Sequence, residues 1–168
     1  CIRDSVDMVE KGFELSEASN TPIFYMMRIR GCHVTGEFVA RDNVAPEFHS
    51  EAPVTPNREP EKIILPPFVY AQEREKIAER LPAAIRFVED NALNEVFPGR
   101  YDSIGIITCG GSYNTVIRAL QRQGLADVYG ETDVPIYCLN VAYPLIPREL
   151  VKFCAGKEQV LVLSLIHI

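Results

Sequence analysis

The sequence predicts an α/β fold in which a parallel β-sheet is preceded by part of a separate unit. Three short apolar segments, residues 103–108, 135–141 and 159–162, alternate with segments of helical periodicity. A proline-rich stretch separates them from a single helix and strand near the N-terminus. Strands that alternate with helices of this length favour a parallel sheet with right-handed crossovers.

The first unit is expected to contain one helix and one strand. Residues 5–16 carry apolar side chains at helical spacing and predict an amphipathic helix. The sequence Asn20-Thr21-Pro22 ends that pattern, and residues 23–30 are rich in β-forming side chains and predict a strand. One helix and one strand cannot bury their own apolar faces. We therefore expect them to belong to a larger sheet.

The second unit follows a linker. Residues 34–67 contain six prolines among charged and small residues and have no sustained periodicity. A stretch of about 30 residues without structure is unusual within one compact domain, so this one is expected to join two domains. Helical sequence then runs from about residue 71 to 96, where Pro82 starts a second helix or kinks the first. Two more helices are expected at 112–123 and 147–155.

Charge, hydropathy and cysteine content exclude several classes of protein. The 168 residues carry a net charge of -6, and the basic residues are scattered, so nucleic acid is not an expected partner. The apolar stretches are far shorter than the roughly 20 residues that cross a bilayer. Five cysteines without a CxxC pair argue against a disulfide scaffold and against a zinc or iron-sulfur site. A reducing cytoplasm is the expected location.

The strongest candidate for a binding site is the turn after the first predicted strand of the second unit. There Gly110, Gly111 and Ser112 lie between that strand and a helix. In open α/β sheets, backbone N–H groups and the positive end of the helix converge at this junction and can hold an anion. The alternative is structural: the glycines make a tight turn and Ser112 caps the helix. The pattern is neither a complete GxGxxG motif nor a Walker loop.

Other polar residues give no assignable chemistry. Arg28, Arg30 and His33 cluster at the end of the predicted strand, where a cation can hold a carboxylate or phosphate, but their spacing names no ligand. His49 and His167 have no neighbours at ligand spacing. No catalytic residue and no metal ligand is predicted.

Several blocks of sequence resemble the large, fused indolepyruvate ferredoxin oxidoreductases, which are thiamine diphosphate-dependent 2-oxoacid:ferredoxin oxidoreductases. The first block resembles the end of their pyrimidine-binding domain, and the last resembles their transketolase C-terminal-like domain. The blocks are MRIRGCHVTG at 27–36, DNVAP at 42–46, LNE at 93–95 and PGR at 98–100, then GII at 105–107, GGSYN at 110–114, IRAL at 117–120, GLAD at 124–127, LNV at 139–141, YPL at 143–145 and FCAGK at 153–157.

The resemblance implies a domain order and a function. Residues 1–33 would end a pyrimidine-binding domain, 34–70 would be the linker, and 71–162 would form the transketolase C-terminal-like domain. The whole enzyme would oxidatively decarboxylate aryl 2-oxoacids, with coenzyme A and ferredoxin as partners in the reaction, and would form a homo-oligomer. Thiamine diphosphate, Mg²⁺ and iron-sulfur clusters would be its cofactors. The residues that hold them are expected elsewhere in the enzyme, so this fragment is expected to be inactive alone.

Two alternatives stay open, and one segment stands apart. The chain could be a free-standing module that binds a nucleotide or coenzyme A at residues 110–114, or a non-catalytic interaction subunit.

Residues 163–168 differ from the resembled family and match the translated end of a transposase adapter used in DNA sequencing. We therefore expect these last six residues, His167 included, to have no biological role.

Overall fold

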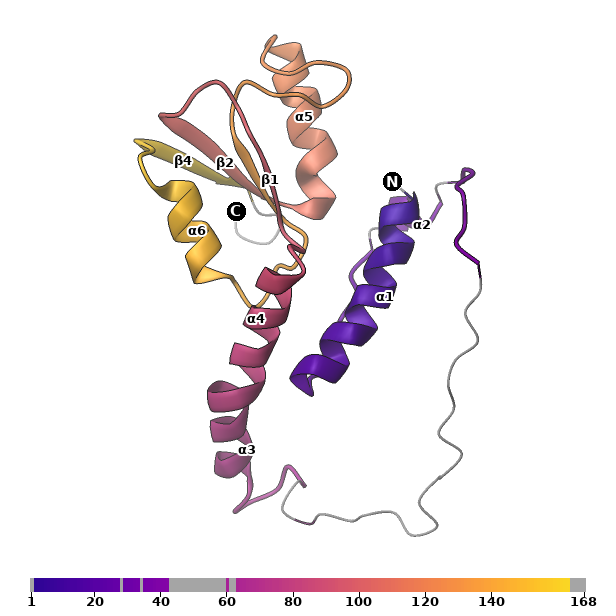
Figure 1. Cartoon of the computed structure of the whole chain (residues 1–168), viewed down its shortest axis with the longest axis vertical. Helices are drawn as coiled ribbons and strands as arrows, with labels where there is room; N and C mark the ends of the chain where they lie inside the picture. The colour runs from indigo at the N-terminus through magenta and orange to yellow at the C-terminus, as the bar shows by residue number, and fades with distance from the viewer. Residues whose placement is uncertain (1, 28, 34, 43–59, 61–62, 164–168) are drawn as a thin grey trace.

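The computed structural model describes residues 2–27, 29–33, 35–42, 60 and 63–163. The described elements form a small sheet with helices on both faces, a helical rod, and a further helix beside the rod (Figure 1). In chain order they are α1 (Ile2–Ser19), α2 (Ile29–Cys32), α3 (Val69–Glu75), a π-helical segment η2 (Lys76–Arg80), α4 (Leu81–Asp90), β1 (Glu95–Phe97), β2 (Ile104–Cys109), a 3₁₀ turn η3 (Gly110–Ser112), α5 (Tyr113–Arg122), β3 (Ile136–Leu139), α6 (Pro147–Cys154) and β4 (Gln159–Leu163).

The sheet confirms the predicted α/β class. Its four strands lie in the order β1-β3-β2-β4. Strand β2 pairs in parallel with both β3 and β4, as the alternation of strands and helices predicted. The short β1 was not predicted, and it pairs with β3 in the antiparallel direction. The sheet is therefore mixed, with a parallel centre of three strands.

The two crossover helices cover opposite faces of the sheet. Ile106 and Ile136 are buried against α5, where Val116, Ile117 and Leu120 complete one apolar cluster. Their neighbours along the strands, Ile107 and Tyr137, are buried against Phe153 of α6 in a second cluster. Successive side chains of a strand point to opposite faces, so each strand contributes to both clusters.

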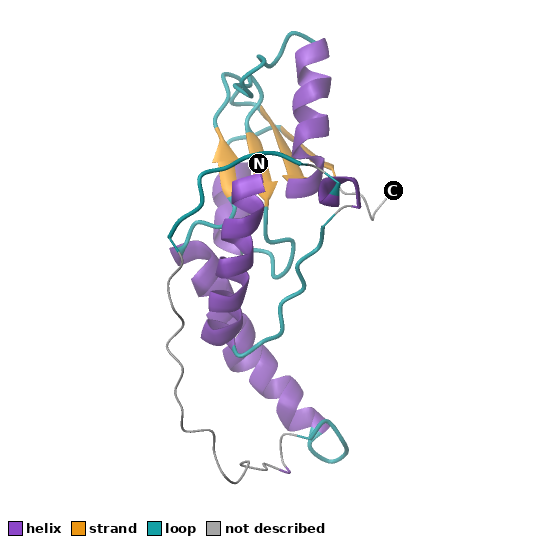
Figure 2. Cartoon of the chain, turned by 90° about the vertical axis from the view of Figure 1, so that its right-hand side faces the viewer, coloured by secondary structure: helices purple, strands orange, loops and turns teal. Residues whose placement is uncertain are grey.

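Helical sequence after the linker ends earlier than expected. Helix α4 stops at Asp90, and Ala92 takes a positive φ of 47° before β1 begins. Pro82 lies in the first turn of α4. It does not end the helix there, and α3, η2 and α4 together form a nearly unbroken helical rod. Because proline has no N–H to donate to the preceding turn, the wider π-helical segment η2 directly before α4 is consistent with its position. Figure 2 shows this rod extending away from the strands.

The predicted strand at residues 23–30 is wrong. In the described part of this segment, residues 21–27 have no regular structure, and Ile29–Cys32 form the short helix α2. A strand requires a neighbour for its N–H and C=O groups, and none pairs with this segment in the described part of the chain. The segment instead runs back along α1, where the Tyr25 hydroxyl donates to the Ser5 carbonyl at 3.0 Å. Its apolar side chains stay exposed, and Phe24 is 88% exposed.

The predicted first helix is confirmed and packs against the second unit. Helix α1 ends at Ser19, and Asn20 follows with a positive φ of 50°, a conformation common just after a helix. Leu15 is buried in a third apolar cluster with Ala84, Val88, Leu93 and Ile146. The two predicted units are thus in contact through α1 and α4, and the boundaries assigned to them remain predictions.

The linker and the terminal tail are described only in part. The described part of the linker up to residue 42 has no regular structure, and residues 43–59 lie outside the description. Leu163, assigned above to the terminal tail, ends β4 and pairs with Thr108, whereas residues 164–168 lie outside the description. No helix in the described ranges is long and apolar enough to cross a membrane.

Candidate functional site

The carboxyl ends of β2 and β3 form a topological switch point. Cys109 of β2 and Leu139 of β3 are register partners at this edge. After β2 the chain turns into α5 on one face, and after β3 it proceeds to α6 on the other. In open α/β sheets ligands bind where neighbouring connections diverge in this way. We call this position the switch-point edge; it comprises Gly110–Ser112 after β2 and Asn140–Val141 after β3.

The three predicted binding residues lie at the switch-point edge. Gly110, Gly111 and Ser112 form the 3₁₀ turn η3 that leads into α5. Ser112 occupies the N-cap position of α5, but its side chain makes no capping hydrogen bond. The alternative role predicted for Ser112, side-chain capping of the helix, is therefore not observed. The turn is held instead by the Tyr113 N–H, which donates to the Gly110 carbonyl.

Asn140 forms the opposite side of the edge and explains one of the glycines. A Cβ added to Gly110 would lie 2.8 Å from Asn140 Oδ1, which is too close for a non-bonded contact. Asn140 Nδ2 donates to the Leu93 carbonyl and to Glu95 Oε2, each at 3.0 Å. The side chain is thus fixed between β1 and the glycine turn. The sequence analysis missed Asn140, although a polar residue directly after a buried strand was a signal that could have found it.

The electrostatics of the edge are set by Glu95. Its carboxylate is exposed and receives the Asn140 amide. Burial, reinforced by Glu95 and Cys109, raises the pKa of the Cys138 thiol to about 11, and this thiol donates to Asn140 Oδ1 at 3.7 Å. Burial also raises the pKa of Tyr113, with further contributions from Cys138 and Glu95. A carboxylate beside the turn opposes a bound anion and favours a ligand group that donates hydrogen bonds.

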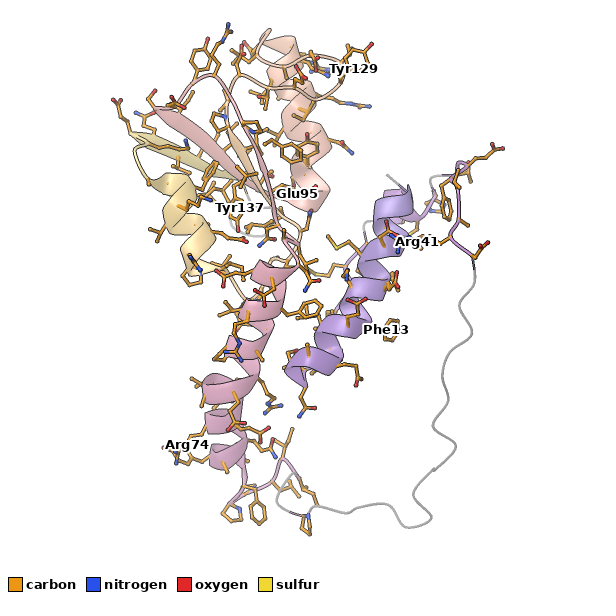
Figure 3. The ribbon with its side chains drawn as sticks, viewed as in Figure 1. Phe13, Arg41, Arg74, Glu95, Tyr129 and Tyr137 are labelled. Carbon is orange, nitrogen blue, oxygen red and sulfur yellow. The ribbon has the colours of Figure 1, made fainter. Side chains whose placement is uncertain are left out.

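A buried polar network supports the edge from behind. The Tyr137 hydroxyl donates to Glu149 Oε2 at 2.5 Å and accepts a hydrogen bond from Asn94 Nδ2 at 3.2 Å. Asn94 Oδ1 accepts the Val141 N–H at 3.0 Å, which ties the loop after β3 to the start of β1. Burial, together with the Glu149 carboxylate, raises the pKa of Tyr137 well above its usual range. Glu95 and Tyr137 both lie toward the end of the sheet near α4 (Figure 3).

The two grooves described on the surface are lined by α5, by residues 97–100 and by residues 128–133, and neither includes the switch-point edge. They have volumes of about 540 and 560 Å³ and share Tyr113, Tyr129 and Gly130 in their linings. Neither is lined by Gly110, Gly111 or Ser112. The predicted binding residues therefore lie at the carboxyl end of β2, as expected, but outside these two grooves. Their role as ligand contacts remains a prediction.

The cationic residues singled out near the end of the first unit lie largely outside the description, so their grouping stays a prediction. Arg28 lies outside the described residues, as does the side chain of Arg30. His33 follows α2 directly and is exposed. The strand end on which they were expected does not form. His49 and His167 also lie outside the description.

The described side chains offer no metal centre. Among the residues described, no three His, Cys, Asp or Glu side chains are close enough together to hold a metal ion. Cys32 and Cys154 are exposed, Cys109 is half-buried and Cys138 is buried. These residues do not fit Mg²⁺ or an iron-sulfur cluster, so no reaction step is assigned to either group here.

The fold and the edge define the class of protein: an α/β domain whose parallel centre ends in a switch point. Comparison with known proteins is more specific. The chain is distantly homologous to the indolepyruvate oxidoreductase subunit IorA. It is 29% identical to that subunit from Methanothermobacter marburgensis over 163 residues, which is 96% of this chain and 25% of the relative. The corresponding subunit of Methanothermobacter thermautotrophicus is 24% identical over 163 residues, with the same 96% and 25% coverage.

The chain spans about a quarter of the length of the curated relatives it matches. No family model matches it, and no solved structure matches it significantly. The relationship therefore rests on the aligned sequence.

Proposed function

We propose that this chain is an internal part of a 2-oxoacid oxidoreductase of the indolepyruvate type. The observation that carries the proposal is the alignment to two IorA subunits over 96% of the chain. In this proposal residues 1–33 end a thiamine pyrimidine-binding domain, and residues 71–162 form a transketolase C-terminal-like domain. The alternation of parallel strands and covering helices from β2 to β4 supports the second assignment.

The exposed apolar surface of the first unit supports a place within a larger protein. Phe13 of α1 is 73% exposed, and Phe24 and Met26 in the following segment are 88% and 77% exposed. Isolated exposed apolar residues are common, but a concentration of large ones on one short unit is typical of a surface that contacts other protein. In the proposed enzyme this surface packs against the remainder of the pyrimidine-binding domain.

The reaction proposed for the whole enzyme is the oxidative decarboxylation of an aryl 2-oxoacid such as indolepyruvate. Coenzyme A receives the acyl group and ferredoxin receives the electrons. Thiamine diphosphate, when bound in the whole enzyme, would supply the electron sink that delocalises the electron pair left by the departing carbon dioxide. We expect the residues described here to contribute no acid, base or metal ligand to that step, and we therefore expect the fragment alone to be inactive.

The test compares the chain with the longer protein that contains it. The reading frame is recovered from the DNA on both sides, and the longer product is purified with thiamine diphosphate and Mg²⁺. We expect indolepyruvate to drive reduction of ferredoxin or methyl viologen in a manner dependent on coenzyme A, whereas the 168-residue chain shows none. A longer product that reduces neither acceptor with any aryl 2-oxoacid would contradict the proposal.

A second candidate is coenzyme A or nucleotide binding at the switch-point edge. The position of Gly110–Ser112 at the switch point favours it, and the nearby Glu95 carboxylate opposes it. Calorimetric titration of the chain with coenzyme A tests it, with Glu95→Gln as the informative variant. We expect Glu95→Gln to tighten binding of an anion at this edge. Equal heats for the two proteins would remove Gly110–Ser112 as the site.

A further inference from the structure

We infer that α1 is a positioning element for the switch-point edge: through the apolar cluster that Leu15 shares with Leu93 and Ile146, it sets the place of Asn140 and of the loop that leads to α6. The loop is residues 140–146, and it carries one side of the edge. Few described side chains of α1 are buried. Among its described side chains, Leu15 is 5% exposed and Ser19 is 2% exposed.

The first contact links α1 to the α4–β1 connection and to the loop that leads to α6. Leu15 shares one apolar cluster with Leu93, which lies between α4 and β1, and with Ile146, which directly precedes α6. Ile146 is completely buried, and Val141 packs on the same cluster. A polar contact lies beside it: Lys11 Nζ donates to Asn91 Oδ1 at 3.4 Å. The cluster that contains Leu15 of α1 thus includes residues near both ends of the loop, Val141 and Ile146.

The second contact carries the position of Leu93 to Asn140. The Leu93 carbonyl accepts a hydrogen bond from Asn140 Nδ2 at 3.0 Å. The next residue, Asn94, accepts the Val141 N–H through its Oδ1 at 3.0 Å. A displacement of the Leu93–Asn94 backbone therefore moves the acceptors that hold both loop residues. Through the segment Leu93–Asn94, these bonds connect the apolar cluster of α1 to the switch-point edge.

The third contact joins Asn140 to the glycine turn. Asn140 Oδ1 lies 2.8 Å from the position that a Gly110 Cβ would occupy, so its placement determines the room beside the turn. The middle of the loop offers little other support, because Tyr143 is 73% exposed and Leu145 is 48% exposed. The loop is held chiefly at its ends, and Leu15 of α1 belongs to the same apolar cluster as Leu93 and Ile146, which help to hold it. The value of this coupling for ligand binding rests on the proposed function; the coupling itself does not.

Hydrogen exchange measured by NMR on the whole chain tests the coupling. Two amides are compared: Val141 N–H, which donates to Asn94, and Ile106 N–H, which donates to the Pro135 carbonyl within the sheet. We expect Leu15→Ala to accelerate exchange of the Val141 amide by about tenfold or more, because the substitution removes packing that stabilises the closed loop and so lowers the free energy of local opening. Exchange of the Ile106 amide should change little. Phe13→Ala is the control on the same helix, since Phe13 points away from α4 (Figure 3).

The outcomes separate the coupling from general destabilisation. Unchanged exchange at Val141 in Leu15→Ala, or equal acceleration at Val141 and Ile106, would overturn the inference. If Leu15→Ala does not fold, the milder Leu15→Val must show the same selective pattern with a smaller amplitude. Coenzyme A titration of the same variants is a separate arm. Absence of binding to the unaltered chain counts against the proposed ligand, while the exchange data still decide the coupling.

Discussion

Replacing Gly110 with alanine tests the contact on which the switch-point edge depends. The added Cβ would lie 2.8 Å from Asn140 Oδ1, whereas ordinary contact begins at 3.4 Å, so the two groups must separate by about 0.6 Å. Asn140 cannot move freely, because its Nδ2 donates to the Leu93 carbonyl and to Glu95 at 3.0 Å each. Losing one or both bonds costs about 1–3 kcal/mol in the free energy of unfolding.

Urea denaturation of four proteins measures this cost as a double-mutant cycle. The proteins are the unaltered chain, Gly110→Ala, Asn140→Ala and the double variant. Removing the Asn140 side chain removes the obstacle, so the Gly110→Ala substitution should cost at least about 1 kcal/mol less in the Asn140→Ala background. Gly31→Ala is the control, because a Cβ at Gly31 would meet nothing within 4 Å. Strictly additive effects of the two substitutions would refute the reasoning.

Three further predictions concern the sheet and its polar network. Gly99→Ala should lower the free energy of unfolding by about 3 kcal/mol or more, seen as a lower Tm, because its Cβ would lie 2.4 Å from the Pro135 backbone nitrogen; an unchanged Tm would contradict this. Tyr137→Phe should cost about 1.5–3 kcal/mol in urea denaturation, because the hydroxyl donates to the Glu149 carboxylate; a cost near zero would mean that the bond adds nothing net. Stability should fall as pH rises above 9, because the Cys138 thiol has a pKa of about 11 when folded against a reference of 9.0, so the unfolded chain loses its proton first. The Cys138→Ala variant should lose less stability than the unaltered chain between pH 9 and 11, and identical pH profiles would sink this assignment.

The parallel centre of the fold could be predicted because its signals are local. Segments 103–108, 135–141 and 159–162 each became a strand within a few residues of the predicted bounds. Each is short and apolar, and a helix long enough to connect parallel strands lies next to it in the sequence. Such patterns indicate burial on both faces of a parallel strand, and β2 and β3 are buried in this way, whereas the edge strand β4 stays largely exposed. The prediction therefore needed no knowledge of which strands pair.

The errors occurred where structure depends on a distant partner. Strand β1 has three residues, and it exists because β3 lies beside it in the antiparallel direction some 40 residues later. The opposite error occurred at residues 23–30, where β-forming side chains lack a neighbouring strand in the described part of the chain. Asn140 was missed for the same reason: its importance comes from Gly110 and Leu93, which are close in space but not in sequence. The glycine turn itself was found because its residue types suffice to indicate it.

The strand order also fixes when the sheet can be completed during synthesis. Strand β2 occupies the interior of the sheet, between β3 and β4, although β4 is made about 50 residues after it. At roughly 5–20 residues per second, the ribosome needs a few seconds to extend the chain from β2 to β4. During that interval one edge of β2 has no strand to pair with. The nascent chain therefore carries an unpaired apolar edge, and a pause in translation before Gln159 would prolong its exposure to aggregation.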